Sequence, residues 1–221
     1  GFAVDRGRST EYFATLGGEA PKENLWDGVD ATWNRVNLSI DALITPIIAA
    51  YNPSKPYESI SALIGLKKSI KALPSSPWTQ KKMAEIDAWV VQAAGIYLGA
   101  TTTQGIIATG EKLNIKTEFI VRAPISVENV SVSFAGQDTT FAGKLQPYKK
   151  YPLQRSITAS AAITQPYWIQ QAKSTGHFNV SDQQKIGQAR VDPAYTAKAT
   201  FTISGEEFKV ERPVQELIVD P

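Results

Sequence analysis

Residues 197–210 read AKATFTISGEEFKV, and this stretch decides the fold of the larger part of the chain. Alternate positions are apolar from Ala197 to Ile203 and again at Phe208 and Val210, which is the period of a strand with one buried face. The four residues between these runs, Ser204 to Glu207, include turn formers. The stretch therefore predicts an antiparallel hairpin.

The same alternation recurs upstream of this hairpin, with turn residues between the runs. It predicts further strands at residues 113–121, 130–134, 141–145 and 153–159. Residues 163–193 are rich in Gln, Ser and Gly and are expected to form a long irregular excursion. Short strands without a helix pattern among them indicate an antiparallel immunoglobulin-like β-sandwich.

The first part of the chain has helical periodicity instead. An apolar stripe at residues 40–51 predicts a helix, in which Pro46 either causes a kink or begins a second helix capped by Thr45. A helix is expected from about Pro56 and another from Pro77, with Ser76 as its N-cap.

Gly99 is a plausible C-terminal cap for this last helix and marks the change from helical to strand periodicity. We therefore divide the chain into a helical region and linker, residues 1–99, and an immunoglobulin-like sandwich, residues 100–221. The predicted fold is about three helices followed by the sandwich.

The composition excludes several classes of function. The 221 residues are 43% hydrophobic, enough for a core, and 23 basic side chains nearly balance 21 acidic ones, which argues against a nucleic-acid partner. No apolar stretch reaches the roughly 20 residues of a membrane span. The chain has no cysteine, and His177 is its only histidine, so we expect no metal site and no cofactor in this segment.

Candidate catalytic groups have simpler interpretations. Ser174, His177 and Asp182 are close in sequence, but no nucleophile elbow surrounds them, and His177 is expected on a surface loop. Asp27 and Asp30 fit a turn or a helix cap better than acid–base catalysis. We therefore expect no catalytic residue in this chain.

Aromatic side chains are the stronger candidates for binding. Tyr148, Tyr151, Tyr167 and Trp168 lie in or beside the irregular excursion, where exposed rings would stack on sugars, although burial in a core is the more common role of such residues. Arg6 and Arg8 flank a glycine and would place two guanidinium groups on one anion or on a neighbouring domain; a structural salt bridge is the simpler alternative.

Several strings resemble a known family. Residues 2–13 (FAVDRGRSTEYF) and 25–33 (LWDGVDATW) resemble the stretch that follows the catalytic core in large PIG-L/LmbE-type deacetylases. Residues 165–168 (QPYW) and 176–180 (GHFNV) are similar to the downstream β-region of those proteins, and residues 108–111 (ATGE) resemble the opening of NEW3-type immunoglobulin-like domains.

The resemblance implies a parent enzyme that removes acetyl groups from N-acetylglucosamine-type sugars. Its zinc would be held by a His-Pro-Asp-Asp motif that this chain lacks, so the catalytic domain is expected upstream of Gly1 as a partner in the same chain. The resemblance also implies a periplasmic or extracellular setting. This segment would then support the enzyme or contact a glycan such as the cell wall. The alternatives are a free-standing carbohydrate-binding or cell-envelope module, or a hydrolase that uses Asp and Glu.

Overall fold

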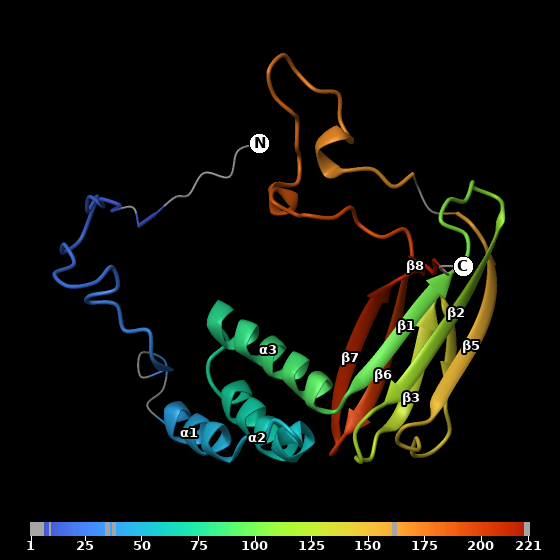
Figure 1. Ribbon diagram of the computed structural model, residues 1–221, viewed down its shortest axis with the longest axis horizontal. Coiled ribbons are helices and arrows are strands. Elements are labelled where there is room, and N and C mark those ends of the chain that lie inside the picture. The colour runs from blue at the N-terminus through green and yellow to red at the C-terminus, as the bar shows by residue number, and fades with distance from the viewer. Residues whose placement is uncertain (1–6, 9, 34–35, 37–38, 161–162, 219–221) are drawn as a thin grey trace. The chain divides into compact units, whose positions relative to one another are not determined.

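The computed structural model describes residues 7–8, 10–33, 36, 39–160 and 163–218 (Figure 1). The chain divides into two compact units, residues 1–45 and residues 46–221. Three α-helices are followed by two four-stranded β-sheets, as the sequence predicts. The helices are α1 (Ile40–Ala50), α2 (Ile60–Lys71) and α3 (Pro77–Ala93), and a 3-10 turn, η2 (Pro56–Ser59), precedes α2.

Local signals position the helices. α1 is a single helix that contains Pro46, so neither a break nor a second helix forms there. At the start of α3, the Ser76 hydroxyl accepts a hydrogen bond from the Thr79 N–H at 3.2 Å, and the Thr79 hydroxyl accepts one from the Ser76 N–H at 2.9 Å. This reciprocal pair is a capping box, and it satisfies donors that a helix N-terminus leaves free.

The sequence prediction is wrong about the end of α3. The helix ends at Ala93, and Gly95 has a positive φ of 60° immediately before strand β1 (Ile96–Thr102). Tyr97 and Gly99 both lie inside this strand, so Gly99 is not a helix cap.

The two sheets form a sandwich with immunoglobulin-type strand order. Sheet A has the order β5-β2-β1-β8, and sheet B has the order β4-β3-β6-β7. This order corresponds to strands A, B and E in one sheet and C′, C, F and G in the other. The two-residue strand β8 pairs in parallel with β1, and all other pairs are antiparallel. The remaining strands are β2 (Lys112–Val121), β3 (Glu128–Phe134), β4 (Gln137–Thr140), β5 (Lys150–Thr158), β6 (Thr196–Ile203), β7 (Glu206–Pro213) and β8 (Gln215–Glu216).

Two tight turns fix the register of the two hairpins in sheet B. Ala135 and Gly136 join β3 to β4, and Ser204 and Gly205 join β6 to β7, all with positive φ. Paired positive φ values are typical of the type I′ turns that match the twist of a hairpin. Residues 206 and 207 therefore begin β7 and are not part of the turn. The strand predicted at residues 141–145 is also wrong, because this stretch is irregular.

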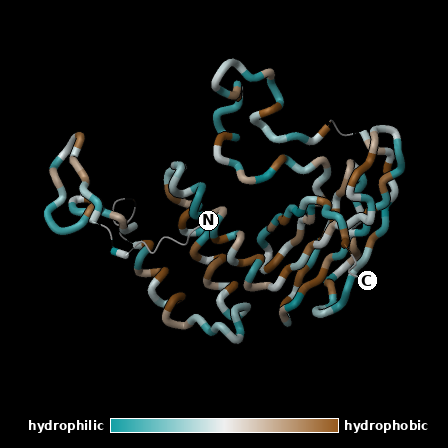
Figure 2. Tube along the Cα trace, turned by 45° about the horizontal axis from the view of Figure 1, so that its top comes forward, coloured by the Kyte–Doolittle hydropathy of each residue, from teal (hydrophilic) through white to brown (hydrophobic). Residues whose placement is uncertain are grey.

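The sandwich core consists of the inward-facing residues of both sheets. The ring of Phe119 in sheet A contacts the ring of Phe201 in sheet B in a tilted arrangement with centroids 5.7 Å apart, and Phe208 stacks on Phe201 at 6.2 Å. Burial of each such side chain contributes about 1.5–3 kcal/mol. Figure 2 shows hydrophobic and hydrophilic positions alternating along the strands, the pattern from which the sequence predicts the sandwich.

The α2–α3 pair packs against the sandwich within residues 46–221. The Lys67 side chain is only 14% exposed: its ammonium group lies 2.5 Å from Asp87 of α3 and 5.1 Å from the ring centroid of Phe208 in β7. The neighbouring Lys68 pairs with Glu206 of β7 at 3.1 Å. The Lys67 charge therefore joins three elements, α2, α3 and β7.

A long excursion connects β5 to β6. It contains two short 3-10 turns, η3 (Tyr167–Ile169) and η4 (Gln183–Lys185), and is otherwise irregular in its described residues, as the sequence predicts. In Figure 1 it extends beyond the end of the strands. Within the described ranges, no helix has the length and apolar character to span a membrane.

Candidate functional site

The four aromatic residues predicted to bind sugar do not form one site. Tyr148 lies in the loop just before β5 and Tyr151 at the start of that strand, whereas Tyr167 and Trp168 lie in the excursion that follows its end. The strand from Tyr151 to Thr158 spans about 23 Å at about 3.3 Å per residue. The structure therefore separates the four rings into two pairs.

In the first pair, Tyr151 is a packing residue. Its ring meets the ring of Phe141 edge-on at 5.3 Å, and its hydroxyl accepts a hydrogen bond from the Gln146 N–H at 2.8 Å. These contacts hold the loop between β4 and β5. Tyr148 is 66% exposed and has a positive φ of 64°. The Tyr148 ring is thus exposed to solvent, but the Tyr151 ring is engaged in packing and does not form a binding surface with it.

In the second pair, the rings of Tyr167 and Trp168 are perpendicular, with centroids 5.0 Å apart. The Tyr167 hydroxyl accepts a hydrogen bond from the Gly187 N–H at 3.0 Å, which fixes the ring against the returning part of the excursion. Trp168 is 37% exposed. Tyr167 therefore supports Trp168, which is the ring available to a ligand.

Hydrogen bonds inside the excursion give this aromatic pair a defined support. The Asn179 side-chain amide donates to the Ala172 carbonyl at 2.6 Å, and the Lys185 ammonium lies 2.6 Å from the Asp192 carboxylate. The hydrogen bond to Asp192, with the attraction of that charge, raises the pKa of Lys185. Long loops with internal order of this kind are often functional.

The excursion is closed where it leaves and rejoins the sandwich. The Ser160 N–H donates to the Tyr195 hydroxyl at 2.9 Å, directly before β6. Ala159 pairs with the loop before β2: its N–H donates to the Glu111 carbonyl, and its carbonyl accepts from the Gly110 N–H, both at 2.8 Å. The tyrosine corner of immunoglobulin-like folds also lies near the start of strand F, but its hydroxyl bonds only a few residues upstream, whereas Tyr195 reaches back 35 residues across the excursion.

The predicted anion contact belongs to the first unit. Arg6 lies outside the described residues. Arg8 is exposed and lies in an irregular segment. In the same unit, the Asp27 carboxylate accepts hydrogen bonds from the N–H groups of Glu23 and Lys22, which lower its pKa. Asp30 accepts from the Thr32 N–H and hydroxyl. Both aspartates thus have the turn role that the sequence predicts.

Ser174, His177 and Asp182 do not form a triad in the excursion. Ser174 and His177 exchange backbone hydrogen bonds, and the Ser174 hydroxyl bonds to Asn179 instead. The Asp182 carboxylate accepts from the Gln184 N–H and caps η4. His177 is exposed on this loop, as predicted.

Acidic groups elsewhere in the described chain are engaged in surface interactions. Hydrogen bonds from lysine side chains lower the pKa of four glutamates. Lys82 lowers the pKa of Glu85, and Lys144 that of Glu128. Lys68 lowers the pKa of Glu206, and Lys209 that of Glu211. No group of three or more His, Asp or Glu side chains among the described residues is placed to hold a metal ion.

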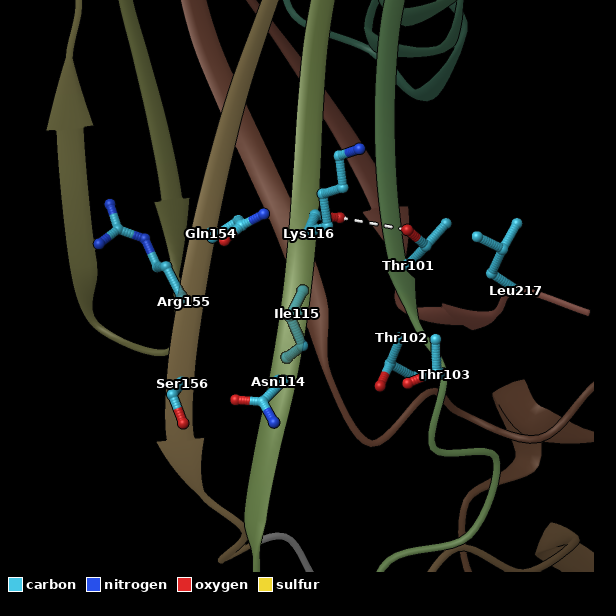
Figure 3. Close-up of a pocket in the computed structure, with 10 residues that line it drawn as sticks. All are labelled: Thr101, Thr102, Thr103, Asn114, Ile115, Lys116, Gln154, Arg155, Ser156 and Leu217. Carbon is cyan, nitrogen blue, oxygen red and sulfur yellow. Dashed lines mark hydrogen bonds between the residues drawn. The ribbon is translucent and has the colours of Figure 1, made fainter.

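The outer face of sheet A carries a shallow depression of about 490 Å³ (Figure 3). Polar side chains of three adjacent strands line most of it, and Leu217 closes one side. Arg155 points away from β2, and its guanidinium group donates to Gln137 and Thr139 of β4, so it ties the open edges of the two sheets. The lining consists of Thr101, Thr102, Thr103, Asn114, Ile115, Lys116, Gln154, Arg155, Ser156 and Leu217.

Comparisons with known proteins give little further information. No family of known proteins matches the sequence, and no curated protein matches it. Among solved structures, the chain is similar to Pseudomonas fluorescens alkylpurine DNA glycosylase AlkC bound to DNA containing an abasic site analog, with 11% sequence identity and a TM-score of 0.20. The match covers 80% of this chain and 50% of that chain. A likeness this weak says nothing about function.

Sequence reasoning missed the depression on sheet A. The sequence signal of this depression is the set of polar residues that alternate with buried ones along two strands. They are Asn114 and Lys116 in β2 and Gln154 and Ser156 in β5. Polar residues on the solvent side of a strand are expected in any sandwich, so the sequence does not distinguish them. Only the strand register shows that these side chains are neighbours.

Proposed function

We propose that this chain is the non-catalytic accessory portion of a zinc-dependent PIG-L/LmbE-type deacetylase that acts on N-acetylated amino sugars outside the cytoplasm. The direction of the carboxyl pKa shifts supports a non-catalytic role. In the described ranges, each carboxyl group with a shifted pKa has it lowered by lysines or backbone N–H groups. A general acid needs the opposite shift, produced by burial away from cations.

The contacts between the helices and the sandwich support a role as a rigid spacer. Lys67 and Lys68 of α2 each contact β7, and the ring of Phe208 lies under the Lys67 ammonium. A domain that holds a neighbouring domain in a fixed orientation needs such contacts between its elements. A flexible linker would leave the orientation of the neighbouring domain unrestrained. The zinc and its ligands would belong to the upstream catalytic domain of the same chain.

A test of this proposal uses the reading frame and the purified chain. We expect a His-Pro-Asp-Asp motif upstream of Gly1, and we expect no acetate release when the 221-residue chain is incubated with chitooligosaccharides and Zn²⁺. The longer protein serves as the positive control. Metal-dependent release of acetate by the chain alone, or a reading frame without the motif, would overturn the proposal.

The exposed Trp168, supported by Tyr167, favours a second candidate, a free-standing carbohydrate-binding or cell-envelope module. This candidate predicts saturable binding of chitooligosaccharide or peptidoglycan fragments that is lost in Trp168→Ala. Trp89→Ala is the matched control, because Trp89 is a comparably exposed tryptophan on α3. The absence of binding at millimolar sugar would count against glycan contact at Trp168 in either candidate.

A further inference from the structure

The depression on sheet A brings together hydrogen-bonding side chains from three strands. In the strand register, Asn114 lies opposite Ser156, and Lys116 lies between Gln154 on β5 and Thr101 on β1. Directly paired residues of adjacent strands point to the same face at about 5 Å separation. Figure 3 shows the Gln154 amide directed toward β2, where Lys116 stands. The result is a compact grid of amides, hydroxyls and one ammonium group.

These side chains are largely free to bind a ligand. Among the described residues, the side-chain amides of Asn114 and Gln154 and the hydroxyl of Ser156 have no hydrogen-bond partner, and the Thr101 hydroxyl makes one long bond, 3.4 Å, to the Lys116 carbonyl. Amides and hydroxyls both donate and accept hydrogen bonds. They therefore match a ligand whose groups also donate and accept hydrogen bonds, such as the hydroxyl groups of a sugar.

Lys116 differs from Lys150, Lys198 and Lys209 on the sheets, and in the described part of the chain it shares the lack of a carboxylate partner with Lys112 of the same strand. On the outer face of sheet B, Lys198 and Lys209 both pair with Glu211, at 3.4 and 2.5 Å. On sheet A, Lys150 pairs with Glu118 at 3.7 Å. In the described part of the chain, Lys116 has no carboxylate within 4.0 Å. Its positive charge is thus available beside the unpartnered amides.

From this arrangement we infer that the outer face of sheet A binds an acidic polysaccharide, with Gln154, Asn114 and Ser156 on the sugar hydroxyls and Lys116 on a carboxylate. The shallow, open shape suits a linear chain that lies across the strands. Nucleic acid fits less well, because single strands bind through stacked aromatic rings and denser positive charge, and no aromatic ring lines the depression. The inference does not depend on the proposed deacetylase context, because it uses a different surface from Trp168.

Titration calorimetry of the whole chain with hexagalacturonate tests this inference. We expect saturable binding that weakens with added salt, at least a tenfold loss of affinity in Lys116→Ala, and a similar loss in the Gln154→Ala/Ser156→Ala double variant. Lys198→Ala is the matched control, an exposed strand lysine on the other sheet, and it should bind as the wild type does. Circular dichroism melts of every variant show whether the fold is retained.

Each alternative ligand gives a separate outcome. Equal binding of chitohexaose, a neutral sugar, would contradict the role of Lys116, and equal binding of poly-glutamate would contradict recognition of a glycan. Tighter binding of a single-stranded oligonucleotide would overturn the inference in favour of nucleic acid. Loss of binding in Trp168→Ala but not in Lys116→Ala would place the glycan on the excursion, which supports the accessory-module proposal and refutes this one.

Discussion

Gly95 occupies a position between α3 and β1 that other residue types fit poorly. Its φ of 60° lies in the left-handed region, and a Cβ atom built there would lie 2.8 Å from the Cβ of Arg122. The Arg122 N–H also donates to the Gly95 carbonyl at 3.0 Å, so the backbone is held in place. Glycine therefore has both a conformational and a steric reason to stand here.

We expect Gly95→Ala to lower the free energy of unfolding by about 2 kcal/mol or more, since left-handed strain adds to the clash with Arg122. Gly110→Ala is the control: its φ is 93°, but a Cβ there would meet open space, so only the strain of about 1 kcal/mol applies. Urea unfolding measures both variants. Equal losses in the two variants would show that the Arg122 contact is unimportant.

Sequence reasoning failed at this residue for a physical reason. Val90, Ala93 and Tyr97 continue one helical stripe, so the periodicity gives no sign that the helix has ended. The positive φ at Gly95 overrides that pattern. The burial of Lys67 was missed in the same way, because its partners Asp87 and Phe208 are distant in sequence.

At the scale of single elements, α3 depends on its first turn. We expect Ser76→Ala to lower the free energy of unfolding by about 1 kcal/mol, because the Thr79 N–H loses its acceptor and the capping box is broken. Ser75→Ala is a suitable control, since Ser75 makes only an exposed contact with the Gln80 side chain. If both variants unfold at the same urea concentration, the capping box does not stabilise the helix.

The excursion depends in turn on its closure by Tyr195. We expect Tyr195→Phe to lower the free energy of unfolding by about 1 kcal/mol and to speed proteolysis within residues 163–194, because the Ser160 N–H loses its partner. Tyr167→Phe removes a hydroxyl that bonds inside the excursion, to Gly187, and should speed proteolysis with little change in global stability. Unchanged cleavage in Tyr195→Phe would contradict this role.

Helices and hairpins that have local sequence signals were predicted well, whereas the contacts between residues of different elements were not. Ser76 with Pro77 marks the start of α3, and Ser204 with Gly205 marks a hairpin, because each signal lies within four residues. The separation of Tyr151 from Trp168 and the grid around Lys116 depend on strand register. Register is set by pairing across many residues, which a single sequence does not reveal.

At the scale of the whole molecule, the helices α2 and α3 are joined to the sandwich by charge as well as by packing. The Lys68 hydrogen bond is the main cause of the lowered pKa of Glu206, and the charges of Lys68, Lys67 and Lys71 add to it. A carboxyl group whose pKa is lower in the folded state stabilises the fold above its unfolded pKa. That contribution is lost as the pH falls through the folded pKa.

We therefore expect Glu206→Gln to be less stable than the wild type at pH 7, with the difference shrinking below about pH 4.3, the ordinary glutamate pKa. Urea midpoints measured from pH 7 to pH 3 follow this difference. Glu207→Gln, at the neighbouring position in β7, is the control. A difference that stays constant over the whole range would show that the charge of Glu206 is not the cause.

The hydrogen bond between Tyr195 and Ser160 has a consequence for how this architecture can vary. This hydrogen bond holds the two ends of the excursion together. We therefore expect the pairing of β5 and β6 with their neighbouring strands to be independent of the sequence between those ends. Insertions, deletions or a grafted peptide between residues 163 and 194 would leave the register of β5 and β6 intact. The fold thus provides a loop position where new binding sequences can be inserted while the two sheets keep their structure.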